Sequence, residues 1–325
     1  MEQRLQFTFC PCGRDVRKCG ILCGGELGKA VAFTLTVSGL FSTVILIDTD
    51  SRRGELLASD LSHTTAPTHA TEVFLGDYAD LSDCGIIVVA REDLFSRVSQ
   101  NASPWISPSL ERTARSISLY NRDAILVVAS EPVELCADLF QRHTGFPAER
   151  VIGTGTLPDT LRLEQMLGRH LGVDANGVNA FIVGARGRHA IPVWSLANVC
   201  GLDFRHFCDC CGRGYEHSVA DGLFEEVRES ACRLFGSHSG AFAVACATER
   251  IARAIVHEEN AVLTVSAKMR GHYGIEDVFL SLPCVVGRHG IRQILDIPLN
   301  EHEEAALRRA AQGLRQSFAQ EMPLR

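Results

Sequence analysis

The sequence has no excess of basic residues and no long apolar run. Its 325 residues include 32 Lys and Arg against 39 Asp and Glu, which gives a formal net charge of −7. Such a chain offers no basic surface to nucleic acid or to an anionic membrane. No apolar run reaches the roughly 18 residues of a membrane span, and residues 1–13 lack the features of a secretion signal. We therefore expect a globular protein of the cytosol, with no nucleic-acid or membrane partner.

A pair of C-x-x-C motifs is also missing, although the chain holds 13 cysteines. Many of them lie inside apolar runs, where they are typical of small core residues in a reducing compartment. Two clusters stand apart, Cys10 with Cys12, and Cys208 with Cys210 and Cys211. A zinc site needs four ligands at a closing geometry, and neither cluster contains two C-x-x-C motifs. We expect no metal site.

No internal repeat or low-complexity linker divides the chain, so only the order of its elements can indicate a domain boundary. In the first half, short runs rich in Ile and Val alternate with helical stretches such as 27–37. The expected strands are 20–24, 43–47, 85–90 and 124–129. Buried runs of this length, joined by helices, favour a parallel sheet with crossover helices.

After about Gly153 the pattern changes to longer helical segments mixed with strands. The expected helices are 161–171, 224–234 and 242–255, and the expected strands are 178–183, 261–267 and 278–286. Asn300, followed three positions later by Glu303, can form a capping pair at the start of an amphipathic terminal helix. With 46% hydrophobic residues, a chain of this length can bury two moderate cores. We predict two domains, 17–152 and 153–325, after an N-terminal arm of residues 1–16.

A glycine-rich turn follows the first expected strand, and it runs Cys23-Gly24-Gly25-Glu26-Leu27-Gly28. It is close to the dinucleotide-binding pattern G-x-G-x-x-G, with Cys23 in place of the first glycine. Gly25 would permit close approach to a pyrophosphate, and Gly28 would permit close packing of helix against strand. The N-terminus of the following helix would offer free N–H groups to the anion. Glycine-rich turns also join strands to helices for packing reasons alone, and this alternative stays open.

The second expected strand ends at Asp48, twenty residues after Gly28. A carboxylate at that position can accept hydrogen bonds from ribose hydroxyls and repel a 2′-phosphate, which favours NAD over NADP. Strand, turn, helix, strand and aspartate thus follow one another in the order of a Rossmann-type dinucleotide-binding unit.

Three strings resemble the L-lactate/malate dehydrogenase family, lactate branch: residues 150–162 (RVIGTGTLPDTLR), 192–195 (PVWS) and 277–284 (DVFLSLPC). The resemblance extends from about Cys19 to Gln316. It implies an α/β fold with a Rossmann-type parallel-sheet domain for NAD and a mixed α+β substrate domain. It also implies a 2-oxo or 2-hydroxy acid as ligand and a homo-oligomer, a tetramer or a dimer, or a heteromer with an active relative.

A second likeness, carried by residues 24–28 and 128–134, is to proteins that fuse a ubiquitin-conjugating-enzyme variant to such a dehydrogenase-like domain.

The family resemblance assigns roles in the active site. Arg162 matches the arginine that grips the substrate carboxylate, and Asp159 matches the aspartate that orients the catalytic imidazole. The proton-donor histidine of the Gly-x-His-Gly string is replaced by Arg186. Arginine has a pKa above about 12 and cannot trade protons near neutral pH. We expect Arg186 to pair with Asp159 and to keep the shape of the site without its chemistry.

Three more positions depart from the family. Glu131 stands where an asparagine contacts the substrate hydroxyl and the nicotinamide, and its charge would oppose the substrate. Arg97 is the nearest candidate for the arginine that polarises the carbonyl, with Arg91 as runner-up. His238 stands at a pocket threonine, where its imidazole could donate the missing proton or simply face water.

Three hypotheses remain open. The chain is a weakened or inactive family member that binds a nucleotide, or an active NAD-dependent dehydrogenase with another proton donor. The third is a structural protein in which the turn is a relic.

Overall fold

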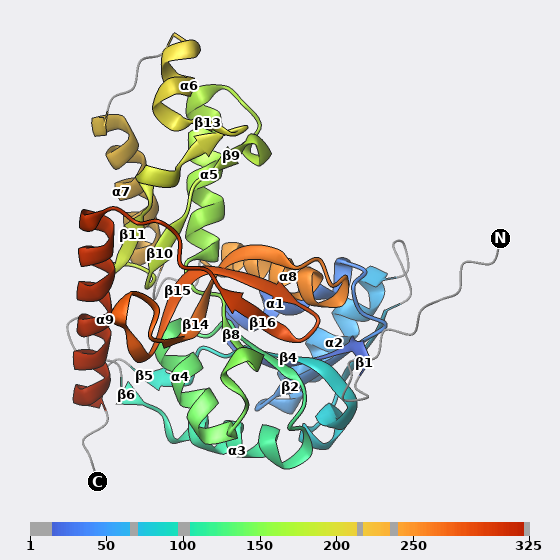
Figure 1. Cartoon of the computed structure of the whole chain (residues 1–325). Helices are drawn as coiled ribbons and strands as arrows, with labels where there is room; N and C mark the ends of the chain where they lie inside the picture. The colour runs from blue at the N-terminus through green and yellow to red at the C-terminus, as the bar shows by residue number, and fades with distance from the viewer. Residues whose placement is uncertain (1–14, 66–70, 97–104, 213–216, 235–239, 322–325) are drawn as a thin grey trace, which may run out of the picture.

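One continuous sheet of eleven strands runs through the part of the chain that the computed structural model describes, residues 15–65, 71–96, 105–212, 217–234 and 240–321. The strand order is β11-β10-β15-β14-β8-β7-β4-β1-β2-β3, and β16 pairs with β15 (Figure 1). Within the described residues, no helix combines the length and the apolar character needed to cross a bilayer.

The first half of the sheet is parallel. Its strands are β1 (Asp15–Cys23), β2 (Thr43–Asp48), β3 (Glu72–Leu75), β4 (Cys84–Ala90), β7 (Ile125–Val128) and β8 (Val151–Gly153). The helices between them are α1 (Gly25–Val37), α2 (Ser51–Thr65), α3 (Pro108–Tyr120) and α4 (Val133–Thr144). Strand β1 starts five residues before the expected 20, because its polar beginning still pairs with β2 and β4.

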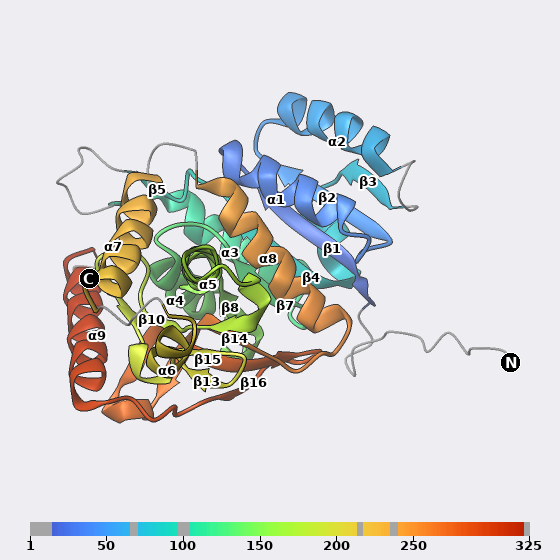
Figure 2. The ribbon, with the colours of Figure 1, turned by 90° about the horizontal axis from the view of Figure 1, so that it is seen from above.

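Both faces of this half of the sheet are buried, and the side chains of successive strand residues point to opposite faces. Ile21 packs in the cluster that includes Val31 of α1, whereas Leu22 packs with Leu110 of α3. Helix α8 (Ala241–Val256) returns from the second half to lie beside α1 (Figure 2). The two layers of helices explain why the strands read as nearly continuous apolar runs.

The second half extends the sheet with antiparallel strands. These are β10 (Ile182–Gly184), β11 (Ala190–Pro192), β14 (Ala261–Arg270), β15 (Glu276–Gly287) and β16 (Gly290–Ile294). A small separate sheet holds β9 (Val178–Asn179), β12 (Asn198–Val199) and β13 (Leu202–Asp203). The single strand expected over 178–183 is wrong, because its first two residues pair with β12 and its end pairs with β11 and β15.

The remaining elements are α5 (Leu157–Leu171), α6 (Phe204–Cys210), α7 (His217–Leu234), α9 (Glu301–Glu321) and the strand pair β5 (Phe95–Ser96) and β6 (Trp105–Ile106). The expected capping pair of α9 is confirmed. The Glu303 N–H donates to Asn300 Oδ1 at 2.9 Å, and the Asn300 N–H donates to Glu303 Oε2 at 3.0 Å. A parallel, doubly covered sheet followed by a mixed second part confirms the predicted α/β class.

Candidate functional site

The residues of the glycine-rich turn lie at the carboxyl edge of the parallel sheet. Cys23, the last residue of β1, pairs in register with Asp48 of β2 on one side and with Ala90 of β4 on the other. The ends of three neighbouring strands therefore converge on the N-terminus of α1. This edge is where α/β sheets bind their ligands.

The backbone of the turn fits a dinucleotide. A Cβ added at Gly28 would lie 2.9 Å from Cys23 Cα and 3.0 Å from the Ala90 carbonyl oxygen, so only glycine allows this close packing. Gly25 has a φ of +72°, which glycine adopts without strain. Leu27 is buried, and Glu26 is half-exposed with an oxygen 2.8 Å from Lys29 Nζ. The turn and Asp48 would hold the dinucleotide, and when bound its reduced form, NADH, would supply the hydride.

One acidic side chain lies on this turn that the sequence did not reveal. The Leu27 N–H donates to Glu92 Oε1 at 2.9 Å. A Cβ at Gly25 would come within 2.1 Å of Glu92 Oε2, which shows how closely the carboxylate approaches the turn. Glu92 lies two residues after the end of β4, and the position of that strand next to β1 was the signal that could have indicated it.

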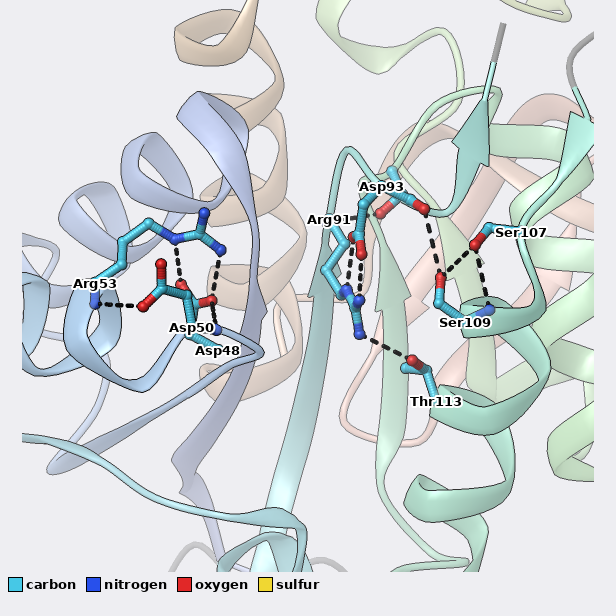
Figure 3. A network of polar contacts seen from close by, with 9 residues as sticks. Asp48, Asp50, Arg53, Arg91, Asp93, Ser107, Ser109 and Thr113 are labelled. Carbon is cyan, nitrogen blue, oxygen red and sulfur yellow. Dashed lines mark hydrogen bonds and ion pairs between the residues drawn. The ribbon is translucent and has the colours of Figure 1, made fainter.

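Asp48 already has a cationic partner. Arg53 Nε donates to Asp48 Oδ2 at 2.9 Å, and Arg53 Nη2 donates to Asp48 Oδ1 at 2.6 Å (Figure 3). The Asp50 N–H donates to Oδ1 as well, at 2.9 Å. A carboxylate has about four acceptor positions, so one remains, but the Asp48 side chain is only 2% exposed and a ribose hydroxyl would have to displace Arg53 to reach it. The expected role of Asp48 is compatible with this geometry only if Arg53 moves, and the sequence did not predict the partner.

Arg91 is not available to polarise a substrate carbonyl, which corrects its place as runner-up. It is 4% exposed and donates through Nε and Nη2 to Asp93 at 2.9 and 2.5 Å. Its Nη1 donates to Thr113 of α3 at 2.9 Å (Figure 3). The first candidate, Arg97, lies outside the described residues, as does His238, for which donation of the proton and exposure to water both stay open.

The other predicted residues come together in a second cluster. Asp159 and Arg162 lie on α5, with Arg162 Nη1 3.6 Å from Asp159 Oδ1. Arg186, just after β10, places its Nε 3.5 Å from Asp159 Oδ2. The Nη1 of Arg186 also donates to Oε1 of Glu131, which precedes α4. The expected pairing of Arg186 with Asp159 is thus present, and the pairing with Glu131 is additional.

These four side chains, called the substrate cluster below, are largely buried, and their formal charges balance; Arg162 and Glu131 are each 20% exposed. The side chains of Arg186 and Asp159 are only 9% and 2% exposed. Burial alone would lower the pKa of Arg186, but Glu131 and Asp159 raise that pKa above its ordinary value. The expectation that the charge of Glu131 simply opposes the substrate must be corrected, because Arg186 compensates it. Arg186 remains a cation at any physiological pH and cannot donate a proton.

Glu134 is a further buried acid that sequence reasoning missed. It lies in the first turn of α4, and Ser281 Oγ donates to its Oε1 at 3.4 Å. Burial, together with the neighbouring charge of Glu131, raises the pKa of Glu134 to about 8. The group is therefore mostly a neutral carboxylic acid at pH 7.

Two models of one family match most of the chain. The lactate/malate dehydrogenase NAD-binding domain matches residues 18–153, and the α/β C-terminal domain of the same family matches residues 156–323. The match to the NAD-binding domain confirms NAD as the predicted cofactor.

Curated relatives and solved structures agree with these models. An L-lactate dehydrogenase of Acetivibrio thermocellus is 33% identical over 309 residues, which cover 93% of this chain and 96% of the relative. An L-lactate dehydrogenase of Clostridium perfringens is 34% identical over 306 residues, 93% of this chain and 96% of the relative.

The structure of the minor L-lactate dehydrogenase of Enterococcus mundtii, in its ligands-bound form, has a TM-score of 0.86 at 26% identity and covers 95% of this chain and 99% of the enzyme. A lactate dehydrogenase from a Medee basin deep-sea metagenome library has the same TM-score at 27% identity, over 93% of this chain and 98% of that one. The chain therefore belongs to the lactate/malate dehydrogenase family.

Proposed function

We propose that this chain is an NAD-binding family member in which the reduction of 2-oxo acids is lost or strongly weakened. The observation that carries the proposal is the buried guanidinium of Arg186, held between Asp159 and Glu131. Reduction of a carbonyl requires a proton for the developing alkoxide. Loss of a positioned acid costs about 10²- to 10⁴-fold in rate.

The charge of the cluster also weakens substrate binding. Arg162 and Arg186 supply two positive charges, and Asp159 and Glu131 supply two negative charges. The carboxylate of a 2-oxo acid would add a negative charge to a group that is already neutral overall. The family resemblance assigns Arg162 to the substrate carboxylate. Its guanidinium already pairs with Asp159, so it would have to bind both carboxylates at once.

The alternative is an active NAD-dependent L-2-hydroxy-acid dehydrogenase that uses another proton donor. Glu134 favours this alternative, because its raised pKa keeps a proton beside Glu131 and Arg186 at neutral pH. The pair of Asp159 and Arg162, which matches the family resemblance, also supports it, since a site without function need not keep them.

The remaining expectations follow from the family. We infer that residues 17–152 bind NAD and that residues 153–325 carry Asp159, Arg162 and Arg186 of the substrate cluster. Residues 1–14 of the expected arm lie outside the described residues, and the arm is corrected at its end, because Asp15 and Val16 belong to β1. We expect a cytosolic homo-oligomer, or a heteromer with an active relative, and light scattering on the purified protein would give the subunit count. The likeness to the ubiquitin-conjugating-enzyme-variant fusion proteins stays a prediction.

The deciding experiment measures NADH oxidation with pyruvate and a panel of 2-oxo acids. It compares the unmodified protein with Arg186→His and with Arg186→His combined with Glu131→Asn. The single change leaves Glu131 without its cation, whereas the double change removes both members of the pair. We expect no turnover, or very slow turnover, in the unmodified protein and a gain of about 10²-fold or more in the double variant.

Two controls separate the alternatives. Turnover in the unmodified protein that disappears in Asp159→Asn would contradict the proposal and establish an active enzyme. Loss of that turnover in Glu134→Gln would assign Glu134 as its proton donor. NADH binding, followed by fluorescence, must be saturable, or the cofactor-binding part of the proposal fails.

A further inference from the structure

We propose that Glu92 acts as an internal competitor for the pyrophosphate of the dinucleotide and so sets the affinity of this chain for NADH. The inference rests on the proposed function, because it assumes that the chain binds NAD. The carboxylate accepts the Leu27 N–H at 2.9 Å, and its other oxygen would lie 2.1 Å from a Cβ at Gly25. The Glu92 carboxylate thus lies against Gly25 and the Leu27 N–H, the part of a dinucleotide-binding turn that phosphate approaches.

The backbone before Glu92 is held in place by several contacts. Ala90 pairs with Cys23 at the end of the sheet, so the following residues pass over the turn. The Arg91 N–H donates to Ser130 Oγ at 2.9 Å, and the Arg91 side chain is held by Asp93 and Thr113. The position of Glu92 above the turn thus follows from buried neighbours and not from the loop alone.

A carboxylate in this position opposes a phosphate in two ways. The N–H group of Leu27 cannot donate fully to both acceptors, and the two anions repel each other in the same partly buried space. The positive end of the α1 dipole stabilises whichever anion is present. Glu92 therefore imitates the ligand's charge within the free protein.

The opposite end of the site has a similar internal partner. Asp48, which would meet the ribose, is already paired with Arg53 through two hydrogen bonds. In both places a side chain of the protein satisfies a group that NAD would use. Glu92 differs from Arg53 in that its charge has the same sign as the phosphate.

Displacement of Glu92 is feasible. The residue is exposed, and the atoms that crowd Gly25 belong to the far end of its side chain. We therefore expect Glu92 to lower the affinity for NADH without blocking it. A ligand without phosphate should not sense the carboxylate.

The test measures dissociation constants for NADH by fluorescence titration, and for adenosine by competition with NADH. The proteins are the unmodified chain, Glu92→Gln and Glu92→Ala. The control is Glu55→Gln, which removes the same charge from an exposed position on α2. Removing a charge-assisted hydrogen bond that competes with the ligand should tighten NADH binding about tenfold in both Glu92 variants. Adenosine binding and the control should change by less than about twofold, because exposed charges are screened.

Equal NADH dissociation constants in all four proteins would overturn the inference while leaving the proposed function intact. An equal gain for adenosine would also overturn it, since the effect would then not act on the phosphates. If no protein binds NADH, the inference and the cofactor-binding part of the proposed function both fail.

Discussion

At the scale of single residues, the substrate cluster shows two replacements that compensate each other. The family resemblance assigns Arg186 to a histidine position and Glu131 to an asparagine position, and the structure pairs the two side chains. A buried cation without a partner is strongly destabilising, so either replacement alone would leave an uncompensated charge. We propose that the pair is one exchange, in which each charge compensates the other and the proposed function follows from the absence of the histidine.

Glu134 gives a prediction for pH-dependent stability. Its carboxyl has an ordinary pKa near 4.5, and burial together with Glu131 raises that pKa to about 8 in the folded protein. Below about pH 4.5 both states are protonated and the group has no effect. As the pH rises to about 8, only the unfolded state loses the proton, so stability falls by about 1.4 kcal/mol per pH unit at most.

Glu134→Gln removes this titration and keeps the shape of the neutral acid. We expect its free energy of unfolding, relative to the unmodified protein, to rise by a few kcal/mol between about pH 5 and 8. Urea unfolding at several pH values measures it, with Glu55→Gln as an exposed control. A difference that does not vary with pH would contradict the assignment.

At the scale of elements, the N-terminus of α9 links the terminal helix to the second domain. Glu303 accepts the Asn300 N–H as part of the capping box. It also accepts the Ser195 N–H at 3.1 Å and the Ser195 hydroxyl at 2.6 Å. One carboxylate thus caps the helix and attaches it to the segment after β11.

The capping box predicts that substitutions at Asn300 and at Glu303 lower the free energy of unfolding by different amounts. Asn300→Ala loses one capping bond and should cost about 1 kcal/mol of stability. Glu303→Ala also leaves both Ser195 groups without their acceptor, so it should cost about 2 to 3 kcal/mol. Urea unfolding midpoints would measure both, beside Gln312→Ala on the exposed side of α9. Equal costs for the two capping variants would show that the Ser195 contacts do not stabilise the protein.

At the scale of the whole molecule, the sheet does not stop at the boundary between the two halves. Ser266 of β14 pairs with Gly153 of β8, and a Cβ at Gly153 would lie 2.8 Å from Ser266 Cβ. Helix α8 of the second half packs on α1 of the first. The largest hydrophobic cluster accordingly includes residues from Cys19 to Ala311.

A shared sheet and core predict that the two halves unfold together. In a Trp105→Phe variant, the fluorescence of Trp194 reports on the second half alone, since the chain holds two tryptophans. Its urea transition should coincide with the far-ultraviolet circular dichroism transition of the whole chain. Two separate transitions would instead indicate that the halves are independent.

The sequence by itself determined the class of fold, the dinucleotide turn and the membership of the substrate cluster. The strands at 43–47 and 85–90 can be predicted from short apolar runs alone. A strand that is buried on both faces must be apolar along its length, whichever elements cover it. The capping pair of Asn300 and Glu303 is equally local. Family strings then indicated Asp159, Arg162 and Arg186 as neighbours, although they are separated along the chain.

Only the tertiary structure decided which charges meet. The partners of Arg186 and of Leu27 lie 55 and 65 positions away in the sequence, and no local pattern connects them. Parallel pairing of β1 with β4 brings Glu92 over the turn, and Arg186, just after β10, meets Glu131, just before α4. Electrostatic interactions act through space. The charge balance of both sites therefore depends on how the strands and helices pack, which their order along the sequence does not specify.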